Sequence, residues 1–172
     1  MTTSKSRRML PAAAADGFAQ RCRAAGLADT PQRRVIYRCL AESLDHPTAE
    51  AVYLRVKPHL PKVSLATVYR NLKLFAEAGI IDEVATGSSL ARYDANQDQH
   101  HHLICKSCGS VADYYDDRLD GAGVLTSAAV IDGFEVHGAK VNVFGLCSAC
   151  RPSAARSESG RSPAADVPST EQ

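Results

Sequence analysis

Apolar residues in the first half of the chain recur at the three-to-four-residue spacing that is typical of helices. The segment from Asp16 to Gly26 begins with a capping residue and ends with a glycine, which predicts a short helix. The next segment opens with Thr30 as an N-cap and Pro31 at the first helical position, where proline loses no hydrogen bond. This predicts a second helix, whose apolar face carries Val35, Ile36, Cys39 and Leu40.

Two further helices are predicted before the pattern changes. One begins at Thr48 and ends near Lys57, because Pro58 lacks an N–H donor and restricts the residue before it. The other runs from a Ser64 cap to Gly79. The apolar side of this last helix is expected to consist of Leu65, Val68, Leu72 and Phe75.

The opposite side of the last helix carries side chains that are typical of a DNA recognition helix. Arg70 and Lys73 point outward, and Thr67 and Tyr69 lie on the flanks. Small and hydrogen-bonding residues in the first turns allow a helix to approach base edges in the major groove. An ordinary solvated helix face is the alternative interpretation. The DNA-contacting residues that we predict are Arg33, Ser64, Thr67, Tyr69 and Arg70.

After Gly79 the pattern shifts to two short strand-like runs on either side of Gly87, Ser88 and Ser89. Such a pattern predicts a β-hairpin. Helices followed by a hairpin make a winged helix, which is a DNA-binding variant of the helix-turn-helix. An unrelated three-helix packing module remains the alternative.

Charge is divided unevenly along the chain, although the net charge is only +1. Residues 15–80 carry ten Lys or Arg against six Asp or Glu, and residues 81–150 carry four against ten. A basic module suits a polyanionic partner and an acidic one suits cations, although chance scatter of surface charge would also give this division. Residues 1–14 are expected to be flexible, and the Ser-, Ala- and Pro-rich residues 152–172 to be disordered.

No apolar run is long enough to span a bilayer, and the N-terminus lacks the apolar stretch of a secretory signal. We therefore expect a cytoplasmic protein without a membrane partner. In a reducing compartment, paired thiols more often hold a metal than form a structural disulfide.

Two C-x-x-C pairs lie far apart in the acidic half, and each follows or ends a strand-like run. If those strands adjoin, four thiolates can bind one zinc ion tetrahedrally. The intervening segment contains a predicted helix from Asp116 to Val130 and a strand over residues 133–145, so the zinc would clamp distant segments. A redox pair or two unlinked buried pairs are the alternatives. The predicted zinc ligands are Cys105, Cys108, Cys147 and Cys150, whereas Cys22 and Cys39 are expected in the core.

Three consecutive histidines precede the first cysteine pair. On a strand, His100 and His102 share one face while His101 points the other way. Asp94 precedes them and Asp113 follows on the returning strand. Such nitrogen and oxygen ligands suit iron(II), manganese(II) or zinc, and a solvated polar loop is the alternative.

The motifs "TPQR", "HPTAEAVY", "SLATVYRNL", "FAEAGII", "RYD", "HHHLICKSCGSVAD" and "CSAC" occur in this order between Asp16 and Arg151. Together they resemble the ferric uptake regulator superfamily of metal-dependent bacterial repressors. The resemblance implies an α/β (α+β) fold, with a winged-helix DNA-binding domain and hinge at residues 15–95 and an α/β dimerisation domain at 96–151. It also implies a four-cysteine structural zinc and adds His46 to a regulatory site with Asp94, His100, His102 and Asp113.

In this family the regulatory ion is expected to draw the domains together, so that a homodimer matches two half-sites of double-stranded operator DNA. The aspartates at positions 94 and 113 resemble the peroxide-sensing branch, since iron-uptake members commonly have glutamate there. Gln99 and Ala139 stand where several iron-uptake members have further histidine ligands, and His137 lies off that position.

The peroxide branch implies a particular chemistry. Bound iron(II) would react with hydrogen peroxide, and the oxidant would modify His46 or His100 in a single use, so no enzyme is expected. An iron- or zinc-uptake repressor of the same family is the first alternative. A non-haem iron enzyme is the second, and no further catalytic group supports it.

Overall fold

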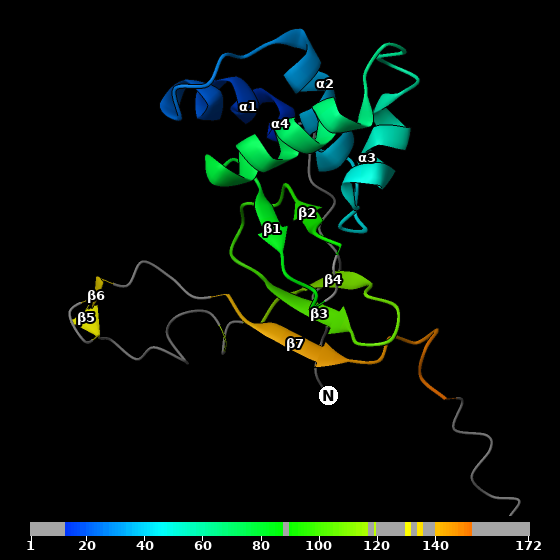
Figure 1. The fold of residues 1–172 in the computed structure, drawn as a ribbon. Coiled ribbons are helices and arrows are strands. Elements are labelled where there is room, and N and C mark those ends of the chain that lie inside the picture. The colour runs from blue at the N-terminus through cyan, green and yellow to red at the C-terminus, as the bar shows by residue number, and fades with distance from the viewer. Residues whose placement is uncertain are drawn as a thin grey trace, which may run out of the picture.

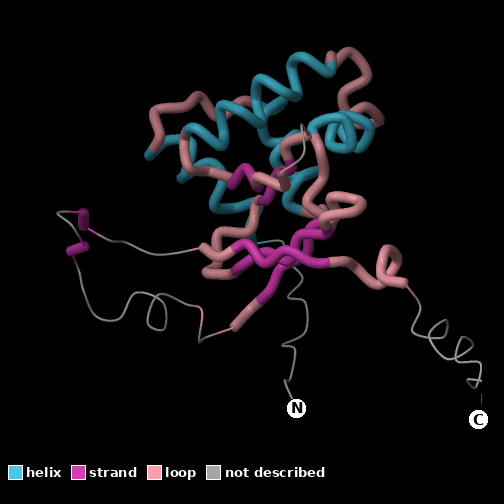
Figure 2. The backbone as a smooth tube through the Cα atoms, turned by 60° about the horizontal axis from the view of Figure 1, so that its bottom comes forward, coloured by secondary structure: helices cyan, strands magenta, loops and turns pink. Residues whose placement is uncertain are grey.

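The computed structural model describes residues 13–87, 90–116, 119, 130–131, 134–135 and 140–152. Helices gather on one side of the molecule and a small sheet lies on the other, with a β-hairpin between them (Figures 1 and 2). This is an α+β arrangement, as predicted. The predictions for residues 1–12 and 153–172 lie outside the described residues.

The helices begin where the sequence provides caps. They are α1 (Ala13–Ala24), α2 (Pro31–Ala41), α3 (Ala49–Val56) and α4 (Leu65–Glu77). The side chains of Thr30, Thr48 and Ser64 accept hydrogen bonds from backbone N–H groups in the first turns of α2, α3 and α4. The α1 helix starts three residues before the predicted Asp16, since it already includes Ala13.

The helices share one apolar core. Phe18 of α1 stacks on Tyr37 of α2 at a centroid distance of 4.5 Å, and both rings meet the edge of Phe75 from α4. Cys22 and Cys39 are buried in this core, as predicted. Leu65 was predicted to join it but is 37% exposed, at the first position of α4.

The hairpin consists of strands β1 (Asp82–Val84) and β2 (Arg92–Asp94), which pair antiparallel. Gly79 has φ 65°, and this left-handed conformation allows the chain to leave α4 and enter β1. The end of β2 also contacts the start of α3, because the Tyr93 N–H donates to the Pro47 carbonyl at 3.1 Å. The hairpin is therefore attached to the helices at two points.

The sheet on the other side has the order β4–β3–β7. Strand β3 (His101–Cys105) pairs antiparallel with β4 (Val111–Tyr114) and parallel with β7 (Asn142–Gly145). Ile104 and Val111 from this sheet form a small buried cluster with Val84 of β1. This cluster packs the sheet against the hairpin.

The segment between β4 and β7 differs from the prediction where it is described. Val130 lies in a short antiparallel pair, β5 (Val130–Ile131) with β6 (Phe134–Glu135), so the helix predicted from Asp116 does not reach it. Asp116 itself follows β4 without regular structure. Leu119 lies in a turn, where its N–H donates to the Asp116 carbonyl at 2.8 Å, and the other residues of that predicted helix lie outside the described residues. No helix in the described part of the chain is long and apolar enough to cross a membrane.

Candidate metal centres and DNA-binding face

Five metal-binding side chains that are far apart in the sequence converge between the helices and the sheet. His46 lies in the loop before α3, Asp94 ends β2, His100 precedes β3, His102 lies in β3, and Asp113 lies in β4. One ligand atom from each lies within 4.8 Å of every other. We call these residues the histidine–aspartate cluster. They are the residues predicted for the regulatory site, and the fold brings all of them together.

The ligand atoms of the histidine–aspartate cluster point at a common centre. His46 Nε2 lies 2.7 Å from Asp113 Oδ1, and His100 Nε2 lies 2.8 Å from Asp94 Oδ2. Despite these short distances, His46 Nε2, Asp94 Oδ2 and Asp113 Oδ1 have no hydrogen-bond partner of acceptable geometry among the described residues. Buried polar atoms without partners are costly, and a cation between them would satisfy all three. The cluster therefore fits a divalent ion.

The charges in the cluster stabilise one another. Burial alone would raise the pKa of Asp94, but the close contacts with the imidazoles of His100 and His102 outweigh it and place the pKa well below its usual range. Burial would likewise raise the pKa of Asp113, and its contact with His46 outweighs this and lowers the pKa. Both carboxylates are therefore ionised and ready to bind a cation at neutral pH.

His100 is held in one orientation. Its Nδ1 lies 2.7 Å from the Asp98 carbonyl, to which it donates as an N–H, so the Nε2 faces the cluster. Burial lowers the pKa of His100, but the contact with the Asp94 carboxylate outweighs burial and raises the pKa above its usual value. His101 is also buried and lies on the opposite face of β3, where its Nδ1 accepts a hydrogen bond from the Val141 N–H at 3.2 Å. This confirms the predicted alternation.

His46 occupies a conformation that non-glycine residues rarely adopt, with φ 47°. The guanidinium of Arg92 donates to the His46 carbonyl at 2.9 Å and fixes this turn of the backbone. Thr48 forms an isolated bridge with the same Arg92, so β2 contacts the loop before α3 both at His46 and at Thr48. The strained backbone directs the imidazole into the cluster, where it is only 4% exposed.

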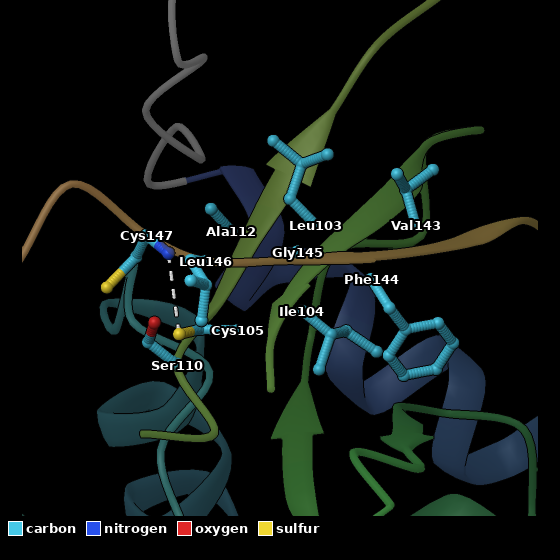
Figure 3. Close-up of a pocket in the computed structure, with 10 residues that line it drawn as sticks. All are labelled: Leu103, Ile104, Cys105, Ser110, Ala112, Val143, Phe144, Gly145, Leu146 and Cys147. Carbon is cyan, nitrogen blue, oxygen red and sulfur yellow. Dashed lines mark hydrogen bonds between the residues drawn. The ribbon is translucent and has the colours of Figure 1, made fainter. Parts of the chain in front are cut away.

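The second site is the four-cysteine cluster of Cys105, Cys108, Cys147 and Cys150, whose sulfur atoms lie within 4.8 Å of one another. The parallel pairing of β3 with β7 places Gly145 beside Cys105 and so brings the two C-x-x-C turns together. Gly109 has φ 66°, which permits the tight turn after the first pair. Figure 3 shows the Cys147 N–H directed at the Cys105 sulfur, a contact of 3.4 Å.

Hydrogen-bond donors favour the thiolate form of Cys105 and Cys108, whereas at Cys150 the neighbouring cysteines outweigh a hydrogen bond from Ser107 and raise the pKa to about 11. The N–H groups of Cys108 and Cys147 lower the pKa of Cys105 to about 6. Ser110 lowers the pKa of Cys108. The close approach of four sulfur atoms offers the ligand set that structural zinc prefers. None of them forms a disulfide.

The predicted DNA-contacting residues lie on α2 and α4, and they differ in their freedom to contact DNA. Ser64 caps α4, and its Oγ lies 2.8 Å from the Thr67 hydroxyl. Arg33 is partly committed to the fold, because it donates to Asn71 Oδ1 at 3.2 Å and to the Ala28 carbonyl at 2.6 Å. Arg70 is exposed on α4.

The exposed Tyr69 of α4 donates a hydrogen bond from its hydroxyl to Glu50 Oε1 at 2.7 Å. Glu50 lies in the first turn of α3, so this bond ties the orientation of the tyrosine ring to a neighbouring helix. The phenol is thereby held in one orientation on the surface of α4.

The residue pattern alone did not reveal three contributors to the histidine–aspartate cluster. Arg92 donates a hydrogen bond to the His46 carbonyl. Asn96 donates its backbone N–H to Asp94, and Tyr115 donates its hydroxyl to Asp113. A signal existed for two of them. Arg92 precedes Asp94 by two positions and Tyr115 follows Asp113 by two, and such spacing places side chains on one face of an extended segment.

A winged-helix unit joined to a small sheet, with two metal-binding clusters, defines a class of metal-dependent DNA-binding regulator. Residues 24–144 match the Ferric uptake regulator family, and the chain belongs to that family. Family members are transcription regulators and not enzymes, which confirms the prediction of a non-enzyme.

Among curated relatives, the chain is 38% identical over 129 residues to the peroxide-responsive repressor PerR of Staphylococcus epidermidis, covering 75% of this chain and 85% of that protein. Among solved structures it is similar to a zinc-bound manganese uptake regulator, with 31% identity, a TM-score of 0.56 and coverage of 76% and 98%. It is also similar to the ferric uptake regulator of Vibrio cholerae, with 27% identity, a TM-score of 0.60 and coverage of 75% and 98%.

Proposed function

We propose that the protein is a homodimeric repressor that binds double-stranded operator DNA when a metal ion occupies the histidine–aspartate cluster, and that it senses hydrogen peroxide. The observation that carries the proposal is the cluster itself, in which three buried imidazoles and two ionised aspartates converge from both sides of the molecule. An ion bound there would fix the helices relative to the sheet. Loss of the ion would free them and weaken DNA binding.

The two clusters suit different metals. The four-cysteine cluster would hold a structural zinc that clamps β7 to the β3–β4 turn. The histidine–aspartate cluster, with nitrogen and oxygen ligands, suits iron(II) or manganese(II), and zinc is also compatible with it.

Iron(II) at this site would let hydrogen peroxide insert one oxygen atom into a ligand imidazole, while the other oxygen atom leaves as water. His46 and His100 are the proposed targets, because both are held within the cluster by contacts outside it. His46 is fixed by the Arg92 bond to its carbonyl, and His100 by the Asp98 carbonyl. An oxidised imidazole would no longer be a good ligand, and the metal and the DNA would be released. The similarity to PerR of Staphylococcus epidermidis supports this proposal.

We place the DNA-binding domain and hinge at residues 15–95 and the dimerisation and metal-binding domain at 96–151. The surface that we propose for dimerisation is the outer face of the sheet. Register pairs Leu103 with both Ala112 and Val143, so the three share that face. Figure 3 shows them on one side of the sheet, with Ile104 and Phe144 on the other. Leu103 is 41% exposed and Val143 38%, and adjoining exposed apolar residues on one face of a sheet suit a protein partner.

The proposal is tested with zinc-loaded protein to which iron(II) or manganese(II) is added without oxygen. Stoichiometric peroxide is expected to abolish operator binding of the iron form and to add one oxygen atom to peptides that contain His46 or His100, as measured by gel shift and mass spectrometry. The manganese form is the control and should keep both its DNA and its histidines. Retention of DNA by the iron form, with both histidines unmodified, would refute peroxide sensing.

A metal-uptake repressor is the second candidate. The similarity to the manganese uptake regulator and to the Vibrio cholerae ferric uptake regulator favours it, because those proteins share the fold. The two functions differ in their signal. A metal-uptake repressor would leave its operator on chelation of the regulatory ion at constant peroxide and would ignore peroxide at constant metal.

A further inference from the structure

The two aspartates of the histidine–aspartate cluster are held asymmetrically. In each carboxylate, one oxygen faces the other cluster residues and has no hydrogen-bond partner among the described residues, namely Asp94 Oδ2 and Asp113 Oδ1. The second oxygen of each carboxylate is hydrogen-bonded from outside the cluster. The difference between the two oxygens arises from two residues, Asn96 and Tyr115.

Asn96 contacts both carboxylates. Its backbone N–H donates to Asp94 Oδ1 at 2.8 Å, and its side-chain amide donates to Asp113 Oδ2 at 3.1 Å. The amide oxygen accepts the Asp98 N–H at 3.1 Å, which fixes the orientation of the amide group. Asn96 is itself only 4% exposed, so water does not compete strongly for these bonds.

Tyr115 completes the arrangement. Its hydroxyl donates to Asp113 Oδ2 at 3.2 Å and accepts a hydrogen bond from the Asn96 amide at 2.8 Å. Asp113 Oδ2 therefore has two donors, from Asn96 and Tyr115, and its lone pairs are directed away from the cluster. The Tyr115 ring also lies beside His100, with ring centroids 5.9 Å apart, so it fills the space next to that imidazole.

We propose that Asn96 and Tyr115 form a clamp that restricts each aspartate to one ligand oxygen and so leaves a coordination position on the ion open to solvent or peroxide. The inference rests on the proposed regulatory site and explains how its reactivity is set. Three imidazoles and two single carboxylate oxygens supply five ligand atoms. Iron(II) and manganese(II) favour octahedral coordination, so five atoms leave one position unfilled. If Asp113 turned both oxygens to the ion, that position would be filled by protein.

The chain offers a matched control for this test. Tyr114 is adjacent to Tyr115, but its hydroxyl donates to Asp116 at 2.8 Å and takes no part in the clamp. Tyr114→Phe and Tyr115→Phe therefore remove the same atom from neighbouring positions, the last residue of β4 and the residue after it. Asn96→Ala removes the amide donor, and the double variant Asn96→Ala/Tyr115→Phe leaves Asp113 Oδ2 without either of its donors.

The first measurement is the number of exchangeable water molecules on bound manganese(II), obtained from water-proton relaxation of the full-length zinc-loaded protein. One water is expected in the wild type and in Tyr114→Phe, and none in the double variant, because Asp113 then takes the position. In the iron form, oxidation of His46 and His100 by peroxide should slow about tenfold or more, the scale on which outer-shell substitutions act. Tyr115→Phe alone preserves the ring and should give a smaller change of the same sign.

The possible outcomes distinguish failure of the clamp from failure of the proposed regulatory site. An unchanged water number in the double variant, with manganese bound and the circular dichroism melt intact, refutes the clamp. If the double variant does not fold, an unchanged water number and oxidation rate in Tyr115→Phe refute it. Wild-type protein that binds manganese in this cluster without any exchangeable water also overturns the inference, although the regulatory site stands. Failure of His100→Ala to reduce manganese binding would instead overturn the site itself.

Discussion

Replacing Arg92 with alanine should weaken metal binding although Arg92 is not a ligand. The residue donates a charge-assisted hydrogen bond of 2.9 Å to the carbonyl of His46. A hydrogen bond of this kind contributes about 1.5–3 kcal/mol, and the lower end applies because Arg92 is only half-buried. The left-handed backbone of His46 costs roughly 1–3 kcal/mol. Without Arg92, the loop should therefore leave this conformation for much of the time.

The expected consequence is a change in affinity. If about 1.5 kcal/mol of support for the His46 conformation is lost, the apparent dissociation constant for manganese(II) should rise about tenfold, because the binding-competent fraction falls by that factor. Isothermal titration of the zinc-loaded protein measures this directly. Arg92→Lys should recover part of the affinity, since an ammonium group can still donate to the carbonyl. Arg38→Ala, which removes a charge from an exposed position on α2, is the control for net charge.

An unchanged affinity in Arg92→Ala would refute the reasoning, and a companion pair of variants tests the strain separately. His46→Gly and His46→Ala both remove the imidazole, but glycine adopts a φ of 47° without a steric penalty. Metal-free His46→Gly should therefore be about 1 kcal/mol more stable to urea than His46→Ala. Equal stability would mean that the backbone is not strained there.

Three further predictions concern the zinc, the DNA and the pH. Cys147→Ser should release about one zinc per chain and abolish folding or dimerisation, since zinc binding supplies ~10 kcal/mol or more of folding free energy at small structural sites. Metal analysis and sedimentation measure the two effects, and a stable zinc-free dimer would contradict the prediction. Arg70→Ala should weaken operator binding and reduce the salt dependence by about one phosphate contact, without changing metal content. Manganese affinity should fall on acidification, because the contact with Asp94 outweighs burial and raises the pKa of His100, so that the ion must displace a proton. The proton released on manganese binding, measured by titration calorimetry in buffers of different ionisation enthalpy, checks this prediction.

The helices could be predicted from the sequence because their signals are local. The caps at Thr30, Thr48 and Ser64 each lie next to the turn that they stabilise, and the structure has all three. The four-cysteine cluster was also predictable, since two C-x-x-C pairs leave few ways to satisfy four thiols. The prediction that Leu65 is part of the buried face of α4 was wrong, because the spacing of apolar residues does not say how far along a helix its packing partner extends.

His46 could not have been assigned to the metal site from the residue pattern. Nothing near it in the sequence is a ligand, and its place in the cluster depends on contacts of β2 with the loop before α3. Only the resemblance to a family predicted it. Asn96 was missed for a related reason, since an amide carries no metal-binding signal. The spacing of Tyr115 from Asp113 was a signal for proximity, but it does not say which carboxylate oxygen the phenol contacts.

Short contacts connect the histidine–aspartate cluster to the proposed recognition helix. Asp94 ends β2, and the residue before it, Tyr93, donates its N–H to Pro47, next to the Thr48 cap of α3. Glu50 in the first turn of α3 then accepts a hydrogen bond from the hydroxyl of Tyr69 on α4. If an ion binds as we propose, it holds His46 and Asp94 in place next to the N-terminus of α3. The α3 residue Glu50 in turn accepts the hydrogen bond that orients Tyr69. Metal occupancy would therefore adjust a side chain of the recognition helix as well as the angle between the domains, and a change at the cluster too small to separate the domains could still alter DNA binding.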